Sequence, residues 1–138
     1  MVNPGPSKVI NTISCPCESN LNYEQCCAPF LQGIQHPKTA EQLMRSRYTA
    51  YVYNNIDYLL LSWHDSTRPK TIDLQPEIKW LGLKIISTDA GQEQDSNGTV
   101  EFVARNKLAG RAFRLHEKSQ FIRENDRWFY LDGEYIEK

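Results

Sequence analysis

The residues best suited to chemistry are four cysteines that lie within thirteen positions near the N-terminus. They form the pattern C-x-C-x8-C-C and are Cys15, Cys17, Cys26 and Cys27, the only cysteines among 138 residues. Four thiolates brought together by one short hairpin make a tetrahedral site of the kind that suits Zn²⁺. Because such a shell is closed, we expect the zinc to be structural rather than catalytic.

Two alternatives remain for these thiols, namely two disulfides or four free cysteines. Direct bridges between the adjacent Cys26 and Cys27, or between Cys15 and Cys17, would be strained, so only cross-pairs would serve. The N-terminus has no apolar signal region, and the longest apolar run is Leu59–Leu61, so we expect a cytoplasmic protein with no membrane contact. Thiols in that reducing compartment bind metal more often than they pair.

A second group with chemical potential lies further along the chain. Arg47 falls in the middle of the apolar arc of a predicted helix, where an unpaired guanidinium is costly because it cannot lose its proton. On a predicted strand, Glu117 shares a face with Phe113, Leu115 and Phe121. We therefore predict that Arg47 and Glu117 form an inward pair, either as a structural ion pair or at the mouth or floor of a ligand pocket.

The histidines give weaker signals. His64 and Asp65 could form a general base with its orienting group, but a helix-capping role is the alternative. His116 falls on the polar face of its strand and is expected to be solvated or to lie on the sheet face. No phosphate loop, nucleophile elbow or H-E-x-x-H pattern occurs. The candidate pocket residues are Arg47, Glu117, Tyr51, Trp63, His64 and Trp80.

Two helices are predicted before the strands. Thr39 and Gln42 form a T-x-x-Q capping box at the start of the first helix, and Asn54-Asn55 ends it. The apolar arc of this helix comprises Ala40, Leu43, Met44, Ala50 and Tyr51. A second helix is predicted from Ile56 to about Trp63, followed by a loop.

The remainder of the chain is strand-like. Strands are predicted around alternating Leu81, Leu83 and Ile85, around Val100 to Ala104, over Arg111 to Arg123, and over Trp128 to Leu131. A polar loop is predicted from about Asp89 to Gly98, and a turn at 124–126. Helices followed by antiparallel strands indicate an α+β fold with helices on one face of a bent sheet.

The chain divides into a flexible tail over 1–13, a cysteine module over 14–36 and an α+β domain over 37–138. Its formal net charge is −1 and its pI is about 6.3. This balance provides no strongly basic field for phosphate contacts, so nucleic acid is not an expected partner.

The segment CPCESNLNYEQCC resembles the SEC-C motif, a small zinc module found at the C-terminus of the SecA translocation ATPase and in many bacterial proteins. Glu18, Asn20 and Leu21 stand where the family pattern has Gly, Gly and Lys. The family module is lysine-rich, whereas residues 14–33 contain two glutamates and no lysine or arginine. With a four-thiolate zinc site of charge about −2, the module would be anionic, which argues against docking onto acidic partners or RNA.

A wider resemblance covers nearly the whole chain. The segments LMRSRYTAYVYNNIDYLLLSWH, WLGLKI, VEFVAR and HEKSQFIRENDRWFYLDG are similar to the YchJ family of bacterial proteins. That resemblance implies an N-terminal SEC-C module joined to a nuclear-transport-factor-like, cystatin-like cone. Many relatives have a second SEC-C module at the C-terminus, and this sequence has no second cysteine cluster. The family implies no activity that could be transferred.

Two hypotheses for function follow. The first is a non-enzymatic adaptor or binding protein with a structural Zn²⁺ module, which would contact a protein partner through that module or a small ligand through the cone. The alternative is a small cone-fold enzyme doing proton-transfer or hydrolytic chemistry with Arg47, Glu117 and His64. A pocket that holds Arg47, Glu117 and a histidine would favour the enzyme. A core filled by aromatic side chains would favour the first hypothesis.

Overall fold

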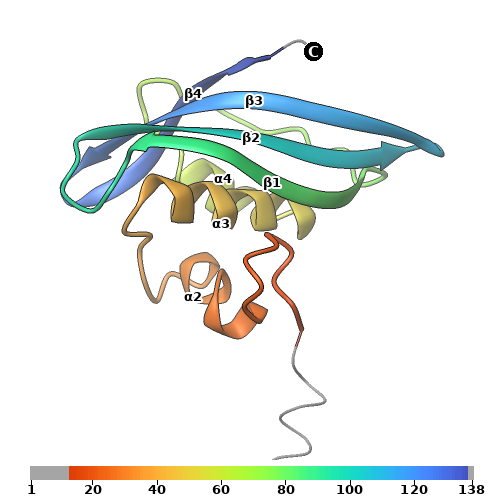
Figure 1. Ribbon diagram of the computed structural model, residues 1–138, viewed down its shortest axis with the longest axis horizontal. Helices are drawn as coiled ribbons and strands as arrows, with labels where there is room; N and C mark the ends of the chain where they lie inside the picture. Colours follow the sequence, from red (N-terminus) through yellow and green to blue (C-terminus); the bar gives the residue numbers. More distant parts are fainter. Residues whose placement is uncertain (1–12, 137–138) are drawn as a thin grey trace, which may run out of the picture.

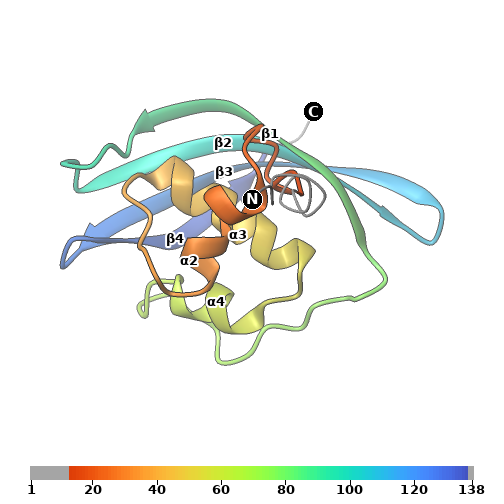
Figure 2. The ribbon, with the colours of Figure 1, turned by 90° about the horizontal axis from the view of Figure 1, so that it is seen from below.

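Helix α3 (Ala40–Val52) lies between a four-stranded antiparallel sheet and the cysteine module in the computed structural model, which describes residues 13–136. The sheet curves over α3 and α4 on one side, and the module lies on the other side (Figure 1). Seen from below, the module covers part of α3 (Figure 2). The predicted tail over 1–13 lies outside the described residues except for Ile13. The predicted α+β architecture is confirmed.

Helix α3 begins where the capping pattern places it. The Thr39 hydroxyl accepts a hydrogen bond from the Gln42 backbone N–H at 3.1 Å. The Gln42 side chain accepts from the backbone N–H of Lys38 at 2.7 Å, one residue before the position that a standard capping box would use. Beyond the predicted apolar arc, the helix also buries Ser46 and Thr49, because it is covered on more than one side.

Helix α4 (Ile56–Leu61) begins with the Asn55 side chain, which accepts from the Tyr58 N–H at 3.0 Å. It ends at Leu61, two residues before the predicted end. The Ser62 carbonyl accepts from the Tyr130 N–H at 2.8 Å, and Trp63 forms a parallel bridge with Tyr130. The chain leaves the helix there because pairing with the last strand replaces the helical hydrogen bonds.

The sheet is a meander in the order β1-β2-β3-β4. Its strands are β1 (Lys79–Ala90), β2 (Asn97–Leu108), β3 (Arg111–Glu124) and β4 (Arg127–Tyr135). The predicted polar loop from Asp89 to Gly98 is shorter than expected, because β1 runs to Ala90 and β2 starts at Asn97. The core between sheet and helix contains Leu43, Met44, Val100, Phe102, Phe121 and Trp128.

Two predicted inward residues face solvent instead. A register shift between Trp80 and Gly82 turns Trp80 toward the helices and leaves Leu81 45% exposed. Phe113 is 46% exposed, although Phe121 on the same strand face is fully buried. The reason is that the β2–β3 hairpin projects beyond the helices, so its inner face has no cover at that end (Figure 1).

Among residues 13–136, no helix has the length and hydropathy needed to cross a membrane.

Candidate metal centre and cone pocket

The four cysteines come together on a short hairpin and the helical turns that follow it. Ser14 and Asn22 form an isolated bridge, and the Cys15 N–H donates to the Leu21 carbonyl at 2.9 Å. The 3-10 turn η1 (Tyr23–Gln25) leads directly into Cys26 and Cys27. The short helix α2 (Ala28–Leu31) follows; its one turn is too brief to leave a periodic pattern in the sequence.

The cysteine sulfurs form one compact group. All four Sγ atoms lie within 4.8 Å of one another, with Cys17 and Cys26 at 3.6 Å and Cys26 and Cys27 at 3.9 Å. No disulfide joins them. Cys15, Cys17 and Cys27 are buried, and only Cys26 is partly accessible. This arrangement is a four-thiolate metal site.

The neighbouring thiols and burial shift the pKa values of three of the cysteines strongly. Burial raises the pKa of Cys26 to about 11. Hydrogen bonds from the neighbouring thiols hold the pKa of Cys15 far below its ordinary value, and the same contacts together with burial raise the pKa of Cys27. A cation bound to all four sulfurs would displace the protons that these raised pKa values keep on Cys26 and Cys27.

Polar groups from outside the cysteine pattern hold the site against helix α3. The Thr49 hydroxyl donates to Cys27 Sγ at 3.3 Å and lies 3.8 Å from Cys15 Sγ. Arg45 Nη1 donates to the Cys17 carbonyl at 2.7 Å. Sequence reasoning missed both residues. In the sequence, the feature that could have identified Arg45 and Thr49 is their i, i+4 spacing, which places both polar side chains on one face of the predicted helix.

The two residues that depart from the glycines of the SEC-C pattern adopt the backbone conformation that glycine favours. Glu18 has φ of 63° and Asn20 has φ of 73°. The Glu18 carboxylate crosses to the sheet edge and accepts from the Leu83 N–H at 3.2 Å. A side chain at Gly82 would collide with this carboxylate, so the absence of a Cβ there permits the contact.

On the opposite side of α3, sheet and helices enclose a cavity of about 330 Å³. It is lined by residues from α3, the Trp63 bridge and all four strands. Aromatic side chains dominate the lining: Tyr48, Tyr51, Trp63, Trp80, Phe102, Tyr130 and Tyr135. Tyr135 is 73% exposed and marks the rim. Of the six predicted pocket residues, only His64 does not line this cavity.

Arg47 is buried in the wall of the cavity, but it does not form the predicted ion pair. Its Nη1 atom donates to the Leu59 carbonyl at 2.8 Å and to the Ser62 hydroxyl at 2.7 Å. Its Cζ atom lies 4.5 Å from the ring centre of Tyr130 and 5.0 Å from that of Trp63. Burial lowers the pKa of Arg47 from its ordinary value. Carbonyl, hydroxyl and ring faces thus replace the expected carboxylate.

Glu117 lines the same cavity with different partners. Its Oε2 atom accepts from the Ser119 hydroxyl at 2.9 Å and from the Tyr130 hydroxyl at 3.5 Å. No oxygen of Glu117 comes within 4.0 Å of Arg47, so the direct contact that we predicted is wrong, although both side chains face one space. Burial raises the pKa of Glu117, and these hydrogen bonds oppose the rise only in part.

Both histidines lie away from the cavity. His64 is next to Trp63 in an extended bridge, so the two side chains point to opposite sides; His64 Nε2 lies 3.0 Å from Glu124 Oε1, and its ring packs on Phe129. His64 Nδ1 lies 3.4 Å from Asp65, which is exposed, and it caps no helix. His116, expected to be solvated or to lie on the sheet face, lies on the sheet opposite Val103 and is mostly buried, with Nε2 2.7 Å from Glu101 Oε2.

Comparisons with known proteins agree with this arrangement. The family model of the YchJ middle NTF2-like domain matches residues 39–133, and that of the SEC-C motif matches residues 13–29. A UPF0225 protein of Bordetella parapertussis is 48% identical over 127 residues, covering 88% of this chain and 92% of the relative. A UPF0225 protein of Streptomyces coelicolor is 44% identical, covering 91% of this chain and 98% of that one.

Two solved structures are similar as well. The solution structure of a SEC-C motif containing protein from Rhodopseudomonas palustris matches with a TM-score of 0.80 and 32% identity, covering 89% of this chain and 98% of the other. The crystal structure of a SEC-C motif containing protein from Psychrobacter arcticus matches with a TM-score of 0.73 and 24% identity, covering 94% and 85%, which bears on the fold alone. The predicted NTF2-like cone is thereby confirmed.

Proposed function

The chain belongs to the family that joins an N-terminal SEC-C motif to a YchJ-type NTF2-like domain, and on that basis we propose that it is a non-enzymatic binding protein of the cytoplasm. A structural zinc ion would fix the SEC-C module on helix α3. The cone would bind a small organic acid with a flat, apolar body. The observation that carries this proposal is the cavity of about 330 Å³, whose wall contains a buried, unpaired Arg47 among aromatic rings.

Zinc is the cation that the cysteine cluster fits best. Tetrahedral coordination with Zn–S bonds of about 2.3 Å requires sulfur–sulfur distances of about 3.8 Å. The distances from Cys26 Sγ to Cys17 Sγ and to Cys27 Sγ, 3.6 Å and 3.9 Å, bracket that value. Cys15, Cys17, Cys26 and Cys27 would be the ligands, and Thr49 would orient two of them by hydrogen bonding to sulfur.

The cone favours an acidic ligand for electrostatic reasons. Both hydrogen bonds of the Arg47 guanidinium use Nη1, so Nε and Nη2 keep donors for a group in the cavity that Arg47 lines. A carboxylate would supply the opposite charge that no described residue within 4.0 Å supplies. Glu117, with its raised pKa, would accept from or donate to the same ligand. Trp63, Trp80 and Tyr130 offer flat surfaces to its body.

The enzymatic alternative has less support. It required a histidine beside Arg47 and Glu117, and neither His64 nor His116 lines the cavity. Glu117 is the one carboxyl group in the cavity with a raised pKa that suits proton transfer, and its one titratable hydrogen-bond partner among the described residues is the Tyr130 hydroxyl, whose pKa is itself raised by burial. Binding of a ligand requires no catalytic group beyond the residues that line the cavity, so we favour a binding function over an enzymatic one.

A thermal-shift screen of paired compounds tests the proposal. Aromatic carboxylic acids should raise Tm, and the corresponding amides, equal in shape but neutral, should raise it much less. Arg47→Met should abolish the difference between acid and amide while the variant stays folded. Arg114→Met, which removes an exposed arginine on the outer sheet face, is the matched control and should keep the difference. Equal shifts for acids and amides, or none for any compound, would contradict the proposal.

A further inference from the structure

Two opposite charges share the cone cavity without contact. Arg47 and Glu117 both line the space of about 330 Å³, yet no oxygen of Glu117 lies within 4.0 Å of a guanidinium nitrogen. Arg47 is only 4% exposed. Charges in such surroundings attract each other strongly because little water screens them, so an ion pair would form unless other contacts held the two side chains apart. The separation of the two charges therefore has a structural cause.

Arg47 is fixed on the helix side of the cavity. Its Nη1 atom donates to the Leu59 carbonyl and the Ser62 hydroxyl, both at the end of helix α4. Its guanidinium also packs on the rings of Trp63 and Tyr130. Both hydrogen bonds use one nitrogen, so Nε and Nη2 keep their donors for a ligand in the cavity.

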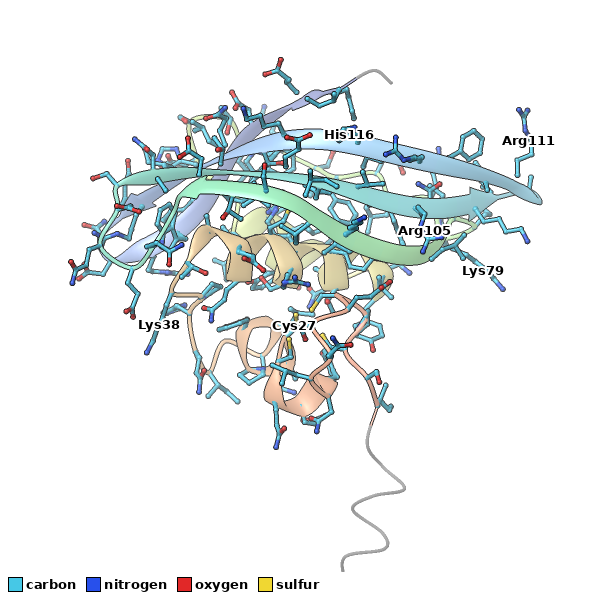
Figure 3. The ribbon with its side chains drawn as sticks, viewed as in Figure 1. Cys27, Lys38, Lys79, Arg105, Arg111 and His116 are labelled. Atoms are coloured by element: carbon cyan, nitrogen blue, oxygen red, sulfur yellow. The ribbon has the colours of Figure 1, made fainter. Side chains whose placement is uncertain are left out.

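Glu117 is fixed on the sheet side. The neighbouring residue His116, labelled in Figure 3, lies on the side of the sheet that faces away from α3, so strand alternation turns Glu117 into the cavity. Its Oε2 atom accepts from the hydroxyls of Ser119 and Tyr130. The carboxylate lies against Gly133, where a Cβ would collide with it. The glycine thus leaves room for the carboxylate beside β4, at a distance from the guanidinium.

Two opposite charges that are fixed apart in one cavity match a ligand that has both charges itself. A dicarboxylic acid would bring a second negative charge beside Glu117, and a simple amine would bring a second positive charge beside Arg47. Both hydrogen bonds that Glu117 accepts use Oε2, so Oε1 keeps its acceptor sites. We propose that the cone binds a small aromatic zwitterion, with Arg47 holding its carboxylate and Glu117 its ammonium group. The proposal rests on the binding function proposed for the cone.

The rest of the cavity limits the size and shape of this zwitterion. A volume of about 330 Å³ is at the lower end of the range for ligand pockets, about 300–1,000 Å³, so the ligand is small. The ring centres of Tyr51 and Trp80 lie 5.9 Å apart. A third ring between them would need about 7 Å, so the two rings form one wall, against which a flat body packs from one side.

Isothermal titration calorimetry at pH 7 with two pairs of compounds tests the proposal. One pair is 4-(aminomethyl)benzoate and 4-methylbenzoate, and the other is phenylalanine and 3-phenylpropionate. The members of each pair differ in the amino group, and the two zwitterions differ in the separation of their charges. In at least one pair the zwitterion should bind about tenfold more tightly than the plain acid, because it gains a charge-assisted hydrogen bond.

The ratio of the two affinities identifies the residue that holds the ammonium group. Glu117→Gln should bring this ratio close to one. Glu134→Gln removes an exposed carboxylate outside the cavity and is the matched control, which should keep the ratio. Arg47→Met should weaken the binding of both members of a pair, because both have the carboxylate.

Gly133→Ala tests the position of the carboxylate without removing it. The atoms that an added Cβ would meet belong to the end of the flexible Glu117 side chain, so the variant should fold. The displaced carboxylate should lower the ratio as Glu117→Gln does, and the double variant should lower it no further.

The possible results separate this proposal from the proposed function. Equal affinities of zwitterion and plain acid in both pairs would overturn the zwitterion proposal and leave acid binding in place. No binding of any of the four compounds would overturn both. A preference that persists in Glu117→Gln, or that is lost equally in Glu134→Gln, would overturn the role of Glu117.

Discussion

The two sides of helix α3 differ in how completely their polar groups are satisfied. On the module side, the thiols contact one another and the Thr49 hydroxyl, and the Arg45 guanidinium donates to the Cys17 carbonyl. On the cone side, Arg47 and Glu117 share a cavity of about 330 Å³ without touching. The first arrangement suits a site that supports the fold. The second arrangement suits a ligand-binding site, because Arg47 and Glu117 carry opposite charges that do not form an ion pair with each other.

The difference also reflects distance along the chain. The metal ligands lie within thirteen residues, so a single hairpin assembles them. The cavity requires α3 and four strands, from Met44 to Tyr135, so it exists only when the whole cone has formed. Helix α3 joins both sites, and the hydrogen bond from the Leu83 N–H to Glu18 is a second link between the module and the sheet.

The largest expected effect is the loss of zinc. Cys15, Cys17 and Cys27 belong to the same core cluster as Leu43 and Trp128, so a strong chelator should destabilise the cone as well as the module. We expect a loss of about 3 kcal/mol or more, which lowers Tm by roughly 10 °C. Metal analysis of protein purified without added zinc should first give one zinc per chain.

Residue-resolved NMR with and without chelator then tests how far the two sides are coupled. Signals from residues 14–36 should disappear, and those of β2 and β3 should persist. If chelation leaves Tm unchanged, the module and the cone are independent units over 14–36 and 37–138. If chelation removes every native signal, the two sides of α3 are one cooperative unit.

The next effect concerns Thr49, whose hydroxyl reaches two sulfurs. Thr49→Val keeps the shape of the side chain and removes the hydrogen bond to Cys27, so the zinc affinity should fall about tenfold. Competition with a chromogenic chelator measures the affinity. Ser46→Ala is the control: its hydroxyl lies on the same helix but bonds to Leu43 and Tyr58, so this variant should lose stability and keep its zinc affinity.

A smaller effect should appear at Glu18, where the module meets the sheet. Glu18→Ala removes the hydrogen bond from the Leu83 N–H and leaves a residue with a Cβ in the left-handed backbone conformation. Glu18→Gly removes the same hydrogen bond, but glycine adopts this conformation without strain. Glycine should therefore be more stable than alanine here by about 1 kcal/mol in urea unfolding. At Glu24, in the 3-10 turn, the order should reverse. Equal stabilities at Glu18 would mean that its backbone is not left-handed.

The smallest effect is the pH dependence that Glu117 gives to the cone. Burial raises the pKa of Glu117, so the native state holds this proton more tightly than the unfolded state. At low pH both states are protonated and the group has no effect; as pH rises from the ordinary glutamate pKa through the raised native value, the free energy of unfolding falls.

Glu117→Gln should therefore gain stability relative to the parent between pH 4.5 and pH 7.5, by less than about 1 kcal/mol because the carboxyl group is only partly buried. Urea unfolding at both pH values measures the gain. Glu101→Gln is a poor control because the Glu101 carboxylate contacts His116 Nε2 at 2.7 Å, so Glu134→Gln, at an exposed position, serves as the control. A gain of equal size in the control would remove Glu117 as the cause.

Sequence alone predicted helices α3 and α4, the four strands and the cysteine cluster, because each depends on local pattern. It placed Arg47 and Glu117 on inward faces correctly, but it could not show that the carbonyl of Leu59 and the ring of Tyr130 would satisfy the arginine. Those partners are fixed by the fold. The bulge at Leu81 and the overhang at Phe113 were also missed, since the alternation continues in sequence after the helix cover has ended.

The meander order of the strands affects how the protein folds during its synthesis on the ribosome. Each strand pairs with its sequence neighbour, so the sheet can grow hairpin by hairpin with short loops to close. Helix α3, however, is synthesised before every strand, and its apolar side has no partner until β1 and β2 emerge. During that interval only the cysteine module and α4, among the described elements, can pack against α3, so metal supply early in synthesis should limit aggregation of the nascent chain.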